Sequence, residues 1–289
     1  MGLARRTGRD SDRLLMMYDP YADETMLALG RIGPLEVRLA TRSDDISEAQ
    51  ALRYDVFYEE GGAVPSLMVK HLRRDHDAFD AVCDHLLVID TERRHGRRIV
   101  GTYRLLRREV AAQQFGFYSE TEFDIAPMLA RHKEARLLEL GRSCVLRPYR
   151  DKRTVELLWH GIWTYVRQHQ IDAMFGCASF DGTDPDQCAL PLSFLARQAL
   201  ARDEWLMRAR GERYVAMDRL IGKPIDLRRA LSAMPPLIKG YLRLGARFGD
   251  GAVIDPAFNT IDVLVILPIK DIEPRYIAHF GANADRHAA

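Results

Sequence analysis

One acidic residue in a mostly apolar run, Glu139, is the side chain best placed to do chemistry in this sequence. The segment LLELGRSCVL, residues 137–146, alternates in a way that predicts a β-strand. Burial among apolar neighbours raises the pKa of a carboxyl group towards the range of a general base. The alternative is a structural ion pair with Arg142 or Arg104, and both roles can hold together. The alternation predicts Leu138, Leu140, Arg142 and Cys144 on one face and Glu139, Gly141, Ser143 and Val145 on the other.

A cationic loop, RPYRDKR, follows this strand at residues 147–153. Pro148 lacks a backbone N–H and biases Arg147 away from helix, so the strand must end here. Thr154 is then the predicted N-cap of a helix whose apolar residues recur from 157 to 166. Between residues 131 and 153, eight Lys or Arg residues stand against three acids. A strand, a basic loop and a helix start present cations and N–H groups to a phosphate or an acidic partner, whereas the alternative is a solvated charged surface.

A second group of charged residues lies earlier in the chain. Arg53 and Phe57 are one turn apart on a predicted helix, and four acids, at 75, 77, 80 and 84, precede or begin a predicted buried strand. Such acids can hold a cationic substrate such as a free amine, although capping and solvation of the loop explain those at 75 and 77 equally well. Arg104 lies in the apolar strand IVGTYRLL and needs a carboxylate or an anionic substrate group beside it.

Composition limits what these residues can belong to. The chain has 289 residues, 47% of them hydrophobic, and a net charge of +1, which predicts a globular protein and argues against a general nucleic-acid binder. Its four cysteines show no metal-ligand spacing, so we expect no metal and a reduced, cytoplasmic protein. No apolar run approaches the roughly 20 residues that span a bilayer. Ser143, Cys144 and Ser179 lack a nucleophile-elbow motif, which disfavours covalent catalysis.

The order of predicted elements indicates an α/β fold with a central sheet. Strands are expected near residues 35–40, 85–90, 99–106, 137–146, 171–180 and 214–218, with helices between them. The C-terminal third contributes a helix over 237–244 and two strands around Asn259, which could complete the sheet and close a substrate pocket. We divide the chain into a flexible N-terminal extension (1–30), a single domain (31–280) and a tail (281–289).

Several of these segments resemble known acyltransferases. The strand, basic loop and helix around residues 137–166 are similar to the GNAT fold, although RPYRDKR replaces the usual glycine-rich loop, which favours a carrier-protein donor over acyl-CoA. The strings ALRYDVF, DAFDAVCDHL, IVGTYRLL and LELGRSCV resemble, in order, the Arg…Phe, Asp…Asp, Arg-Leu and Glu-x-x-Arg stations of acyl-homoserine-lactone synthases. The fold this implies is a GNAT-like, mixed and mostly antiparallel sheet flanked by helices.

A broader resemblance, from about Leu29 to Phe280, is to the bacterial ornithine-acyl-carrier-protein N-acyltransferases. It is carried by ALRYDVFYEEGGA, FDAVCDHLLVID, FYSETEFDI, LELGRSCVLRPYRDKRTVELLWHGIW, MFGCASFDGTDP and PPLIKGYLRLGARFGDGAVIDPAFNTIDVLVILPI. The resemblance implies transfer of a 3-hydroxyacyl group from acyl carrier protein to the α-amino group of L-ornithine, the first step of ornithine lipid synthesis. It implies no cofactor, since the acyl-phosphopantetheine is a co-substrate, and peripheral contact with the inner membrane.

The resemblance also implies roles for individual residues. Glu139, with Arg142, is expected at the catalytic position. The donor is expected to meet Ser143, Cys144, Val145, Arg147, Arg150, Lys152, Arg153 and Thr154, and the acceptor to meet Arg53, Phe57, Asp80, Asp84 and Arg104. Two alternatives stay open: a synthase of the same fold that uses S-adenosylmethionine as the amine, and a membrane-binding, hemolysin-like protein.

Overall fold

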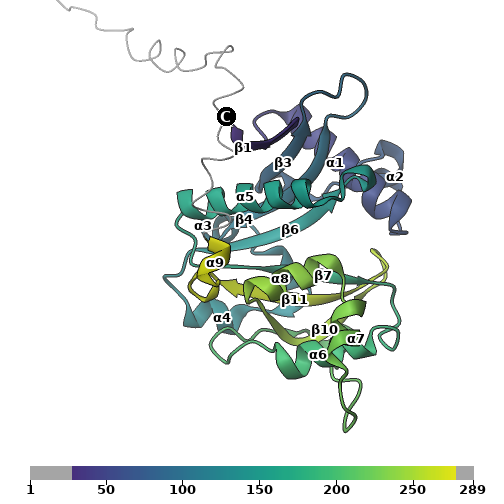
Figure 1. The fold of residues 1–289 in the computed structure, drawn as a ribbon, viewed down its shortest axis with the longest axis vertical. Helices are drawn as coiled ribbons and strands as arrows, with labels where there is room; N and C mark the ends of the chain where they lie inside the picture. Colours follow the sequence, from purple (N-terminus) through teal and green to yellow (C-terminus); the bar gives the residue numbers. More distant parts are fainter. Residues whose placement is uncertain (1–27, 278–289) are drawn as a thin grey trace, which may run out of the picture.

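The computed structural model of the protein describes residues 28–277, which form one continuous sheet with helices on both faces (Figure 1). The predicted tail and residues 1–27 of the predicted extension lie outside the described residues. Residues 28–30, assigned to that extension, instead begin the first strand, which pairs with the second and packs on a helix. The main strands are β1 (Ala28–Ile32), β2 (Leu35–Leu39), β3 (Asp84–Asp90), β4 (Ile99–Arg107), β6 (Leu137–Val145), β7 (Ala173–Asp181), β10 (Arg247–Asp255) and β11 (Thr260–Pro268).

The sheet is mixed and mostly antiparallel, as the sequence predicts. Its order is β1-β2-β3-β4-β6-β7-β11-β10, extended by the two-residue strands β8 (Arg208–Ala209) and β5 (Phe123–Asp124), with β9 (Tyr214–Val215) also paired to β10. Only β6–β7 and β10–β8 are parallel pairs in this part of the chain. The C-terminal strands complete the sheet through β11, which pairs with β7 along its whole length.

Helices cover both faces of the sheet. They are α1 (Ser43–Tyr54), α2 (Leu67–Leu72), α3 (Arg108–Gln113), α4 (Ala126–Arg131), α5 (Lys152–Gln168), α6 (Ala189–Gln198), α7 (Leu227–Ala233), α8 (Pro236–Leu244) and α9 (Pro274–Ile277). The α1 helix continues into a wider turn over Asp55–Glu60 and ends before Gly61. No helix within residues 28–277 is both long and apolar enough to cross a membrane.

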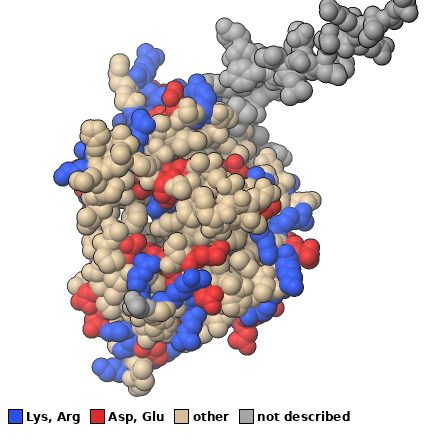
Figure 2. Space-filling model, turned by 180° about the vertical axis from the view of Figure 1, so that it is seen from behind, with Lys and Arg blue, Asp and Glu red and all other residues tan. Residues whose placement is uncertain are grey.

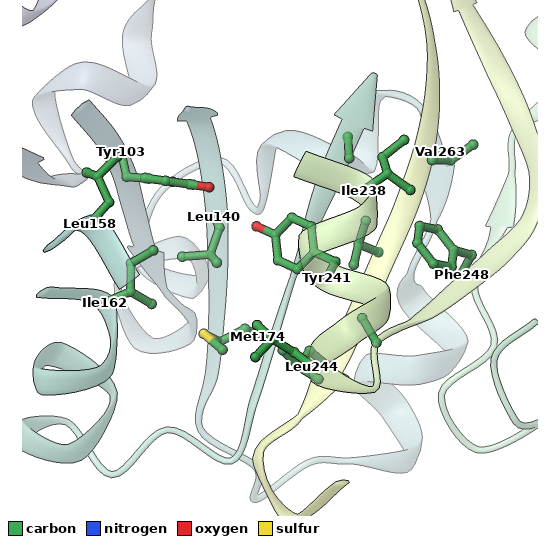
Figure 3. Close-up of a cluster of buried hydrophobic side chains, with 14 of the residues drawn as sticks. Tyr103, Leu140, Leu158, Ile162, Met174, Ile238, Tyr241, Leu244, Phe248 and Val263 are labelled. Atoms are coloured by element: carbon green, nitrogen blue, oxygen red, sulfur yellow. The ribbon is translucent and has the colours of Figure 1, made fainter. Parts of the chain in front are cut away.

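The largest core cluster lies beneath α5 and α8, on one face of the sheet. Ile162 of α5 and Ile238 of α8 are fully buried there, each contributing about 1.5–3 kcal/mol through burial. Figure 3 shows Tyr103 and Tyr241 directing their hydroxyl groups towards each other beside Leu140. The opposite face has two clusters, one under α1 and one formed by α3, α4 and the strands β7 and β11.

The strands β6 and β7 pair over three residues only and then separate. The last pair is Glu139 with Phe175. The two strands still approach closely at Gly176, where an added Cβ would lie 2.2 Å from the carbonyl oxygen of Leu140, so only glycine fits. Beyond this point the edge of β6 that faces β7 has no ladder partner, and the sheet opens into a V between these strands.

The helix α5 begins earlier than the sequence prediction places it. Its N-cap is Asp151, whose Oδ1 accepts a hydrogen bond of 2.9 Å from the backbone N–H of Thr154. Thr154 is therefore a buried residue of the first turn and not the cap. Asp and Thr both cap helices well. Asp151 is the cap because α5 then gains an additional turn against the sheet. Lys152 and Arg153 lie in that turn, outside the loop.

Candidate active site

A cavity of about 610 Å³ lies where β6 and β7 separate, and the β10–β11 turn closes its far side. Its wall takes residues from both faces of the sheet. Leu140 and Ala178 in its wall belong to the core beneath α5 and α8, whereas Cys177 packs with the cluster on the opposite face. Six of the predicted site residues line it: Phe57, Arg104, Glu139, Arg142, Ser143 and Arg150.

Glu139 is buried, with 4% of its surface exposed, in the cavity wall. Its Oε1 accepts hydrogen bonds from the N–H (2.7 Å) and hydroxyl (2.6 Å) of Ser119, and its Oε2 accepts one from the N–H of Tyr118 (2.9 Å). Burial raises the pKa of Glu139 above its ordinary value, against these hydrogen bonds and the charge of Arg104. A carboxylate has about four lone pairs, so these three bonds leave one on Oε2 able to accept a proton.

The predicted alternation along β6 fails at Arg142. Arg142 has a φ of 50°, and the pairing with β4 shifts register here, a β-bulge that inserts one extra residue. The bulge reverses the faces of everything after it. Arg142 therefore shares the face of Glu139, Cys144 packs under α1, and Val145 packs against the core beneath α5.

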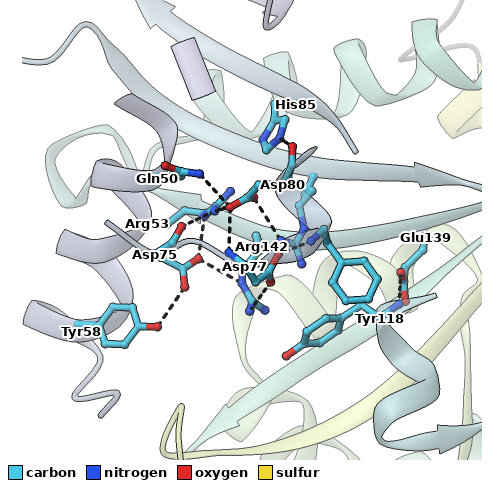
Figure 4. Close-up of polar contacts among 12 residues, drawn as sticks. Gln50, Arg53, Tyr58, Asp75, Asp77, Asp80, His85, Tyr118, Glu139 and Arg142 are labelled. Atoms are coloured by element: carbon cyan, nitrogen blue, oxygen red, sulfur yellow. Dashed lines mark hydrogen bonds and ion pairs between the residues drawn. The ribbon is translucent and has the colours of Figure 1, made fainter. Parts of the chain in front are cut away.

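Neither arginine pairs with Glu139, so the predicted structural ion pair is wrong. The guanidinium groups of Arg53, Arg104 and Arg142 instead meet the carboxylates of Asp75, Asp77 and Asp80, and we call these six residues the Arg–Asp network. Figure 4 shows Glu139 apart from this network, hydrogen-bonded to the turn that carries Tyr118.

Arg53 is the centre of the network. It is fully buried, and it contacts Asp75 Oδ2 and both oxygens of Asp80 at 2.8 Å. Arg104 reaches Asp77 at 2.6 Å and Asp80 at 3.2 Å. Although burial alone would raise the pKa of Asp80, Arg53 and Arg104 hold it below its ordinary value. The network is a matched set of charges that fixes the start of β3 against α1 and β4.

Arg142 connects the network to the cavity. It contacts Asp75 at 3.2 Å and Asp77 at 3.3 Å, and its guanidinium carbon lies 4.8 Å from the ring centroid of Tyr118 and 4.7 Å from that of Phe258. Burial would lower its pKa, but Tyr118 and the two aspartates raise it well above the ordinary value. Arg142 is thus a fixed cation, stacked between two rings, in the cavity wall.

Three of the predicted acceptor residues do not line the cavity. Arg53 and Asp80 are buried within the network, where Nε and Nη2 of Arg53 and both carboxylate oxygens of Asp80 are hydrogen-bonded, while Nη1 of Arg53 has no partner among the described residues. Asp84, at the start of β3, accepts a hydrogen bond of 2.5 Å from the hydroxyl of Tyr165 and lies 3.6 Å from Arg107. Neither carboxylate is in the cavity wall, so the ammonium-binding role predicted for Asp80 and Asp84 does not fit their positions. Phe57 and Arg104 do line the cavity.

The predicted donor residues divide into three sets. Ser143 and Arg150 line the cavity, and Arg150 is fixed by Val145 O at 2.9 Å and Glu60 at 2.7 Å. Arg147, Lys152 and Arg153 are exposed around the start of α5. Cys144 and Thr154 are buried away from the cavity, so direct contact of their side chains with a donor does not fit the structure. Burial raises the pKa of the Cys144 thiol to about 12, which makes it a poor nucleophile.

The sequence reasoning missed three buried carboxylates, Glu122, Asp255 and Asp262, which we call the acidic trio. One oxygen from each lies within 4.8 Å of the others, the one such cluster of potential cation ligands within residues 28–277. No ion pair joins the trio to a Lys, Arg or His of the described chain. Asp255 and Asp262 line the cavity, and Glu122, 3% exposed, lies beside them without lining it.

The pKa values of Glu122 and Asp262 move in the opposite direction to that of Asp80. Burial, followed by the charges of Asp262 and Asp255, raises the pKa of Glu122 to about 7. Burial raises the pKa of Asp262 to about 6, against the hydroxyl groups of Ser179 and Thr260. Asp262 stands in the apolar strand TIDVLVILP as Glu139 stands in LLELGRSCV, and that shared pattern could have identified it.

A family match gives the class of this protein. A family of acetyltransferase (GNAT) domains matches residues 52–160, the part of the chain that includes Glu139 and the point where β6 and β7 separate. The solved structure of FeeM, an N-acyl amino acid synthase from uncultured soil microbes, is similar with a TM-score of 0.46 and 13% identity, covering 82% of this chain and 92% of that one. The protein is an acyltransferase of the GNAT fold, as predicted.

Two curated relatives narrow the family. The chain is 55% identical over 259 residues to the L-ornithine N(alpha)-acyltransferase of Agrobacterium fabrum (strain C58), which covers 89% of this chain and 88% of the relative. It is 54% identical over 263 residues to that of Rhizobium meliloti (strain 1021), covering 90% and 89%. The chain belongs to the family of L-ornithine Nα-acyltransferases, which confirms the resemblance seen in its sequence.

Proposed function

We propose that this protein transfers a 3-hydroxyacyl group from acyl carrier protein to the α-amino group of L-ornithine and so forms lyso-ornithine lipid. The observation that carries the proposal is Glu139, a buried carboxylate of raised pKa that accepts three hydrogen bonds and stands in the wall of a cavity lined from both faces of the sheet. The names of the relatives supply the amine. Such a cavity lets a thioester and an amine meet from opposite faces.

The chemistry is aminolysis of a thioester. Glu139 accepts one proton from the α-ammonium, directly or through a water molecule, and the amine nitrogen attacks the thioester carbonyl carbon. The tetrahedral intermediate collapses, the C–S bond breaks, and the second proton lost by the nitrogen goes to the departing thiolate. The products are an amide and the free thiol of the carrier protein, and Glu139 returns its proton to solvent.

In this scheme the thioester of the acyl donor binds where β6 and β7 separate. The carbonyl oxygen of the thioester becomes negative as the amine attacks, and backbone N–H groups on the unpaired edge of β6, within residues 140–145, are suitable donors for it. Arg142, fixed between Tyr118 and Phe258, is the cation best placed for the carboxylate of the acceptor.

One assay tests this function. Purified protein is incubated with 3-hydroxyacyl carrier protein and either L-ornithine or S-adenosylmethionine, and products are identified by mass spectrometry. We expect Nα-acylated ornithine and stoichiometric free carrier-protein thiol. A lactone formed from S-adenosylmethionine would favour the synthase alternative, and leakage of liposomes without acyl transfer would favour the lytic one.

The carrier protein is expected to dock at the start of α5. Arg147, Lys152 and Arg153 are exposed there, close in sequence to Arg150 in the cavity wall. This cationic surface is local, because on the face shown in Figure 2 the described Lys and Arg residues are interspersed with Asp and Glu.

Charge reversal separates docking from chemistry. The triple change of Arg147, Lys152 and Arg153 to Glu should raise the KM for acylated carrier protein about tenfold and leave a short phosphopantetheine thioester little affected, because electrostatic steering acts on the carrier. Reversal of Lys223, Arg228 and Arg229, exposed around α7, is the control with the same change in net charge. Equal losses with both donors would mean that the loop shapes the active site.

Peripheral membrane contact has a structural candidate in α2. The exposed apolar side chains of Val64, Leu67, Met68 and Leu72 gather there, with Leu67 89% exposed, and Lys70 lies among them. An apolar surface with cations suits an anionic bilayer, where an acylated product must go. Replacing Leu67 and Met68 by Glu should reduce co-sedimentation with phosphatidylglycerol vesicles several-fold. The same changes at Leu227 and Leu231 of α7 are the control, and equal binding by both variants would exclude α2.

A further inference from the structure

We propose that the acidic trio of Glu122, Asp255 and Asp262 binds the side-chain ammonium group of the acceptor and so selects a diamino acid over a neutral one. This inference rests on the function proposed above and assigns one part of its substrate. It replaces the positions that the sequence suggested for ammonium binding, Asp80 and Asp84, which the structure places outside the cavity wall.

Strand register puts the trio on the same face of the sheet as Glu139. Glu139 is paired with Phe175, and Cys177 and Ser179 follow on that face of β7. Asp262 of β11 lies directly opposite Ser179. Side chains two residues apart along a strand point to the same side, so a row of polar groups runs from Glu139 across β7 to Asp262. The acceptor can therefore contact the base and the trio from one side of the sheet.

A series of short contacts sets an upper limit on the distance between the carboxylates of Glu139 and Glu122. The Ser119 hydroxyl donates to Glu139 at 2.6 Å and lies 3.6 Å from the Cys177 sulfur, which in turn donates to Glu122 Oε2 at 3.5 Å. The two carboxylates can be no further apart than the length of this series. The two nitrogens of extended ornithine are about 6 Å apart by standard bond lengths, and each hydrogen bond adds about 2.8 Å. One ornithine molecule can thus reach both.

The trio lacks the counter-charge that a buried carboxylate needs. Oδ1 of Asp262, in a residue 7% exposed, has no hydrogen-bond partner among the described residues. The nearest positive charges act only at a distance, Arg142 on Asp262 and Arg213 on Glu122. Burying a carboxylate without a partner is costly, so the arrangement calls for a cation from outside the chain.

The chemistry of the trio favours an ammonium group over a divalent metal. Asp255 Oδ1 already accepts two backbone hydrogen bonds, from Ala257 (2.8 Å) and Phe258 (3.2 Å), and Glu122 Oε2 accepts one from Cys177. Few oxygens remain for a magnesium or calcium ion, which takes six or more. An ammonium has three N–H donors, one for each carboxylate.

The test compares L-ornithine with L-norvaline, which has the same carbon chain without the side-chain amine. For the unmutated enzyme with acylated carrier protein, we expect kcat/KM for ornithine to exceed that for norvaline by about 100-fold or more, since a buried polar site rejects a ligand that leaves it unpaired. Asp262→Asn and Glu122→Gln, each measured separately, should lower kcat/KM for ornithine about 100-fold and change norvaline by less than threefold. Asp84→Asn is the control and should leave the ratio unchanged.

The outcomes distinguish this inference from the proposed function. If ornithine and norvaline are acylated equally well, acyl transfer to an amino acid stands and the ammonium subsite is wrong. Equal losses for both acceptors in a folded Asp262→Asn or Glu122→Gln protein also overturn it. Loss of activity on chelation with EDTA, restored by a divalent metal only when the trio is intact, would make the trio a metal site instead. No acylation of either amino acid would defeat the proposed function itself.

Discussion

Two clusters of buried charge border one cavity, and they are balanced in opposite ways. The Arg–Asp network has three guanidinium groups and three carboxylates, joined by contacts of 2.6 to 3.3 Å. The acidic trio has three carboxylates and no ion pair within the described chain. A matched set of buried charges is complete without a ligand, whereas an unmatched set is not. The comparison separates residues that build the site from residues that bind a substrate.

One aspartate from each cluster shows the difference in charge balance most directly. Asp80 and Asp262 are both buried, with 6% and 7% of their surfaces exposed. Two guanidinium groups hold the pKa of Asp80 below its ordinary value, while burial and the charge of Asp255 raise that of Asp262 to about 6. Burial alone therefore does not decide which acid serves the substrate. The charges of the neighbouring residues decide which acid is available, because they compensate the charge of Asp80 and leave that of Asp262 uncompensated.

The largest effect is expected from breaking the balance of the network. Arg53→Met leaves Asp75 and Asp80 buried without their main partner, which should lower the free energy of unfolding by about 3–5 kcal/mol. Urea denaturation monitored by circular dichroism measures this. Arg219→Met removes a partly exposed partner, 3.1 Å from Asp186, and should cost at most about 1 kcal/mol.

The trio supplies the counterpart to this experiment. Asp262→Asn removes one of three like charges, so the variant should unfold at the same urea concentration as the unmutated protein or at a higher one near pH 8. A destabilisation as large as that of Arg53→Met would show that Asp262 has a structural partner, and would remove the contrast between the two clusters.

The next largest effect concerns Glu139, which belongs to neither cluster. Glu139→Gln keeps the shape and loses proton acceptance, so kcat/KM for ornithine should fall about 100-fold or more. The amide can no longer accept all three hydrogen bonds, which should cost about 1 kcal/mol of stability and leave the protein folded.

Glu120→Gln is the matched control. Glu120 lies in the turn Tyr118–Thr121, which donates hydrogen bonds to Glu139, and it accepts a hydrogen bond of 2.8 Å from the N–H of Phe117 without lining the cavity. Wild-type turnover in a folded Glu139→Gln protein would remove Glu139 from the mechanism.

The local features of the fold could be predicted from the sequence. The alternation in LLELGRSCVL and IVGTYRLL gives β6 and β4, and the acid in an apolar run gives Glu139, because these signals lie within one strand. The bulge at Arg142 could not be predicted in the same way. Arg142 itself takes the left-handed conformation, although the glycine stands one residue earlier at 141, and the bulge reverses every side chain that follows on β6.

The acceptor side of the site depends on long-range pairing. Residue 122 meets residues 255 and 262 only because β11 joins β7 and β10 joins β11, and no sequence spacing records that contact. Asp80 and Asp84 lie at the start of a predicted buried strand, and the resemblance implied that they hold the ammonium group. Their partners, Arg53, Arg104 and Tyr165, become visible only in three dimensions.

The smallest expected effect, and the sharpest test of the comparison, is the pH dependence of substrate choice. The pKa values of Glu122 and Asp262 are raised to about 7 and about 6, so the trio gains negative charge as the pH rises through this range. The kcat/KM for ornithine relative to norvaline should therefore rise about tenfold between pH 5.5 and 8, since one pH unit across a pKa is worth about 1.4 kcal/mol.

The ratio of the two kcat/KM values is the quantity to measure. Deprotonation of the α-amine and of Glu139 changes kcat/KM for both acceptors in the same way, so its effect cancels in the ratio. Asp255, Cys177, Arg142 and Arg213 also act on these two groups. Among these, Asp255 carries the like charge that keeps both values raised, and the arginines keep their charge over the whole range. In Asp262→Asn the rise should shrink and follow Glu122 alone. A ratio that stays flat from pH 5.5 to 8 in the unmutated enzyme would show that the trio does not meet the ammonium, and that its imbalance serves another purpose.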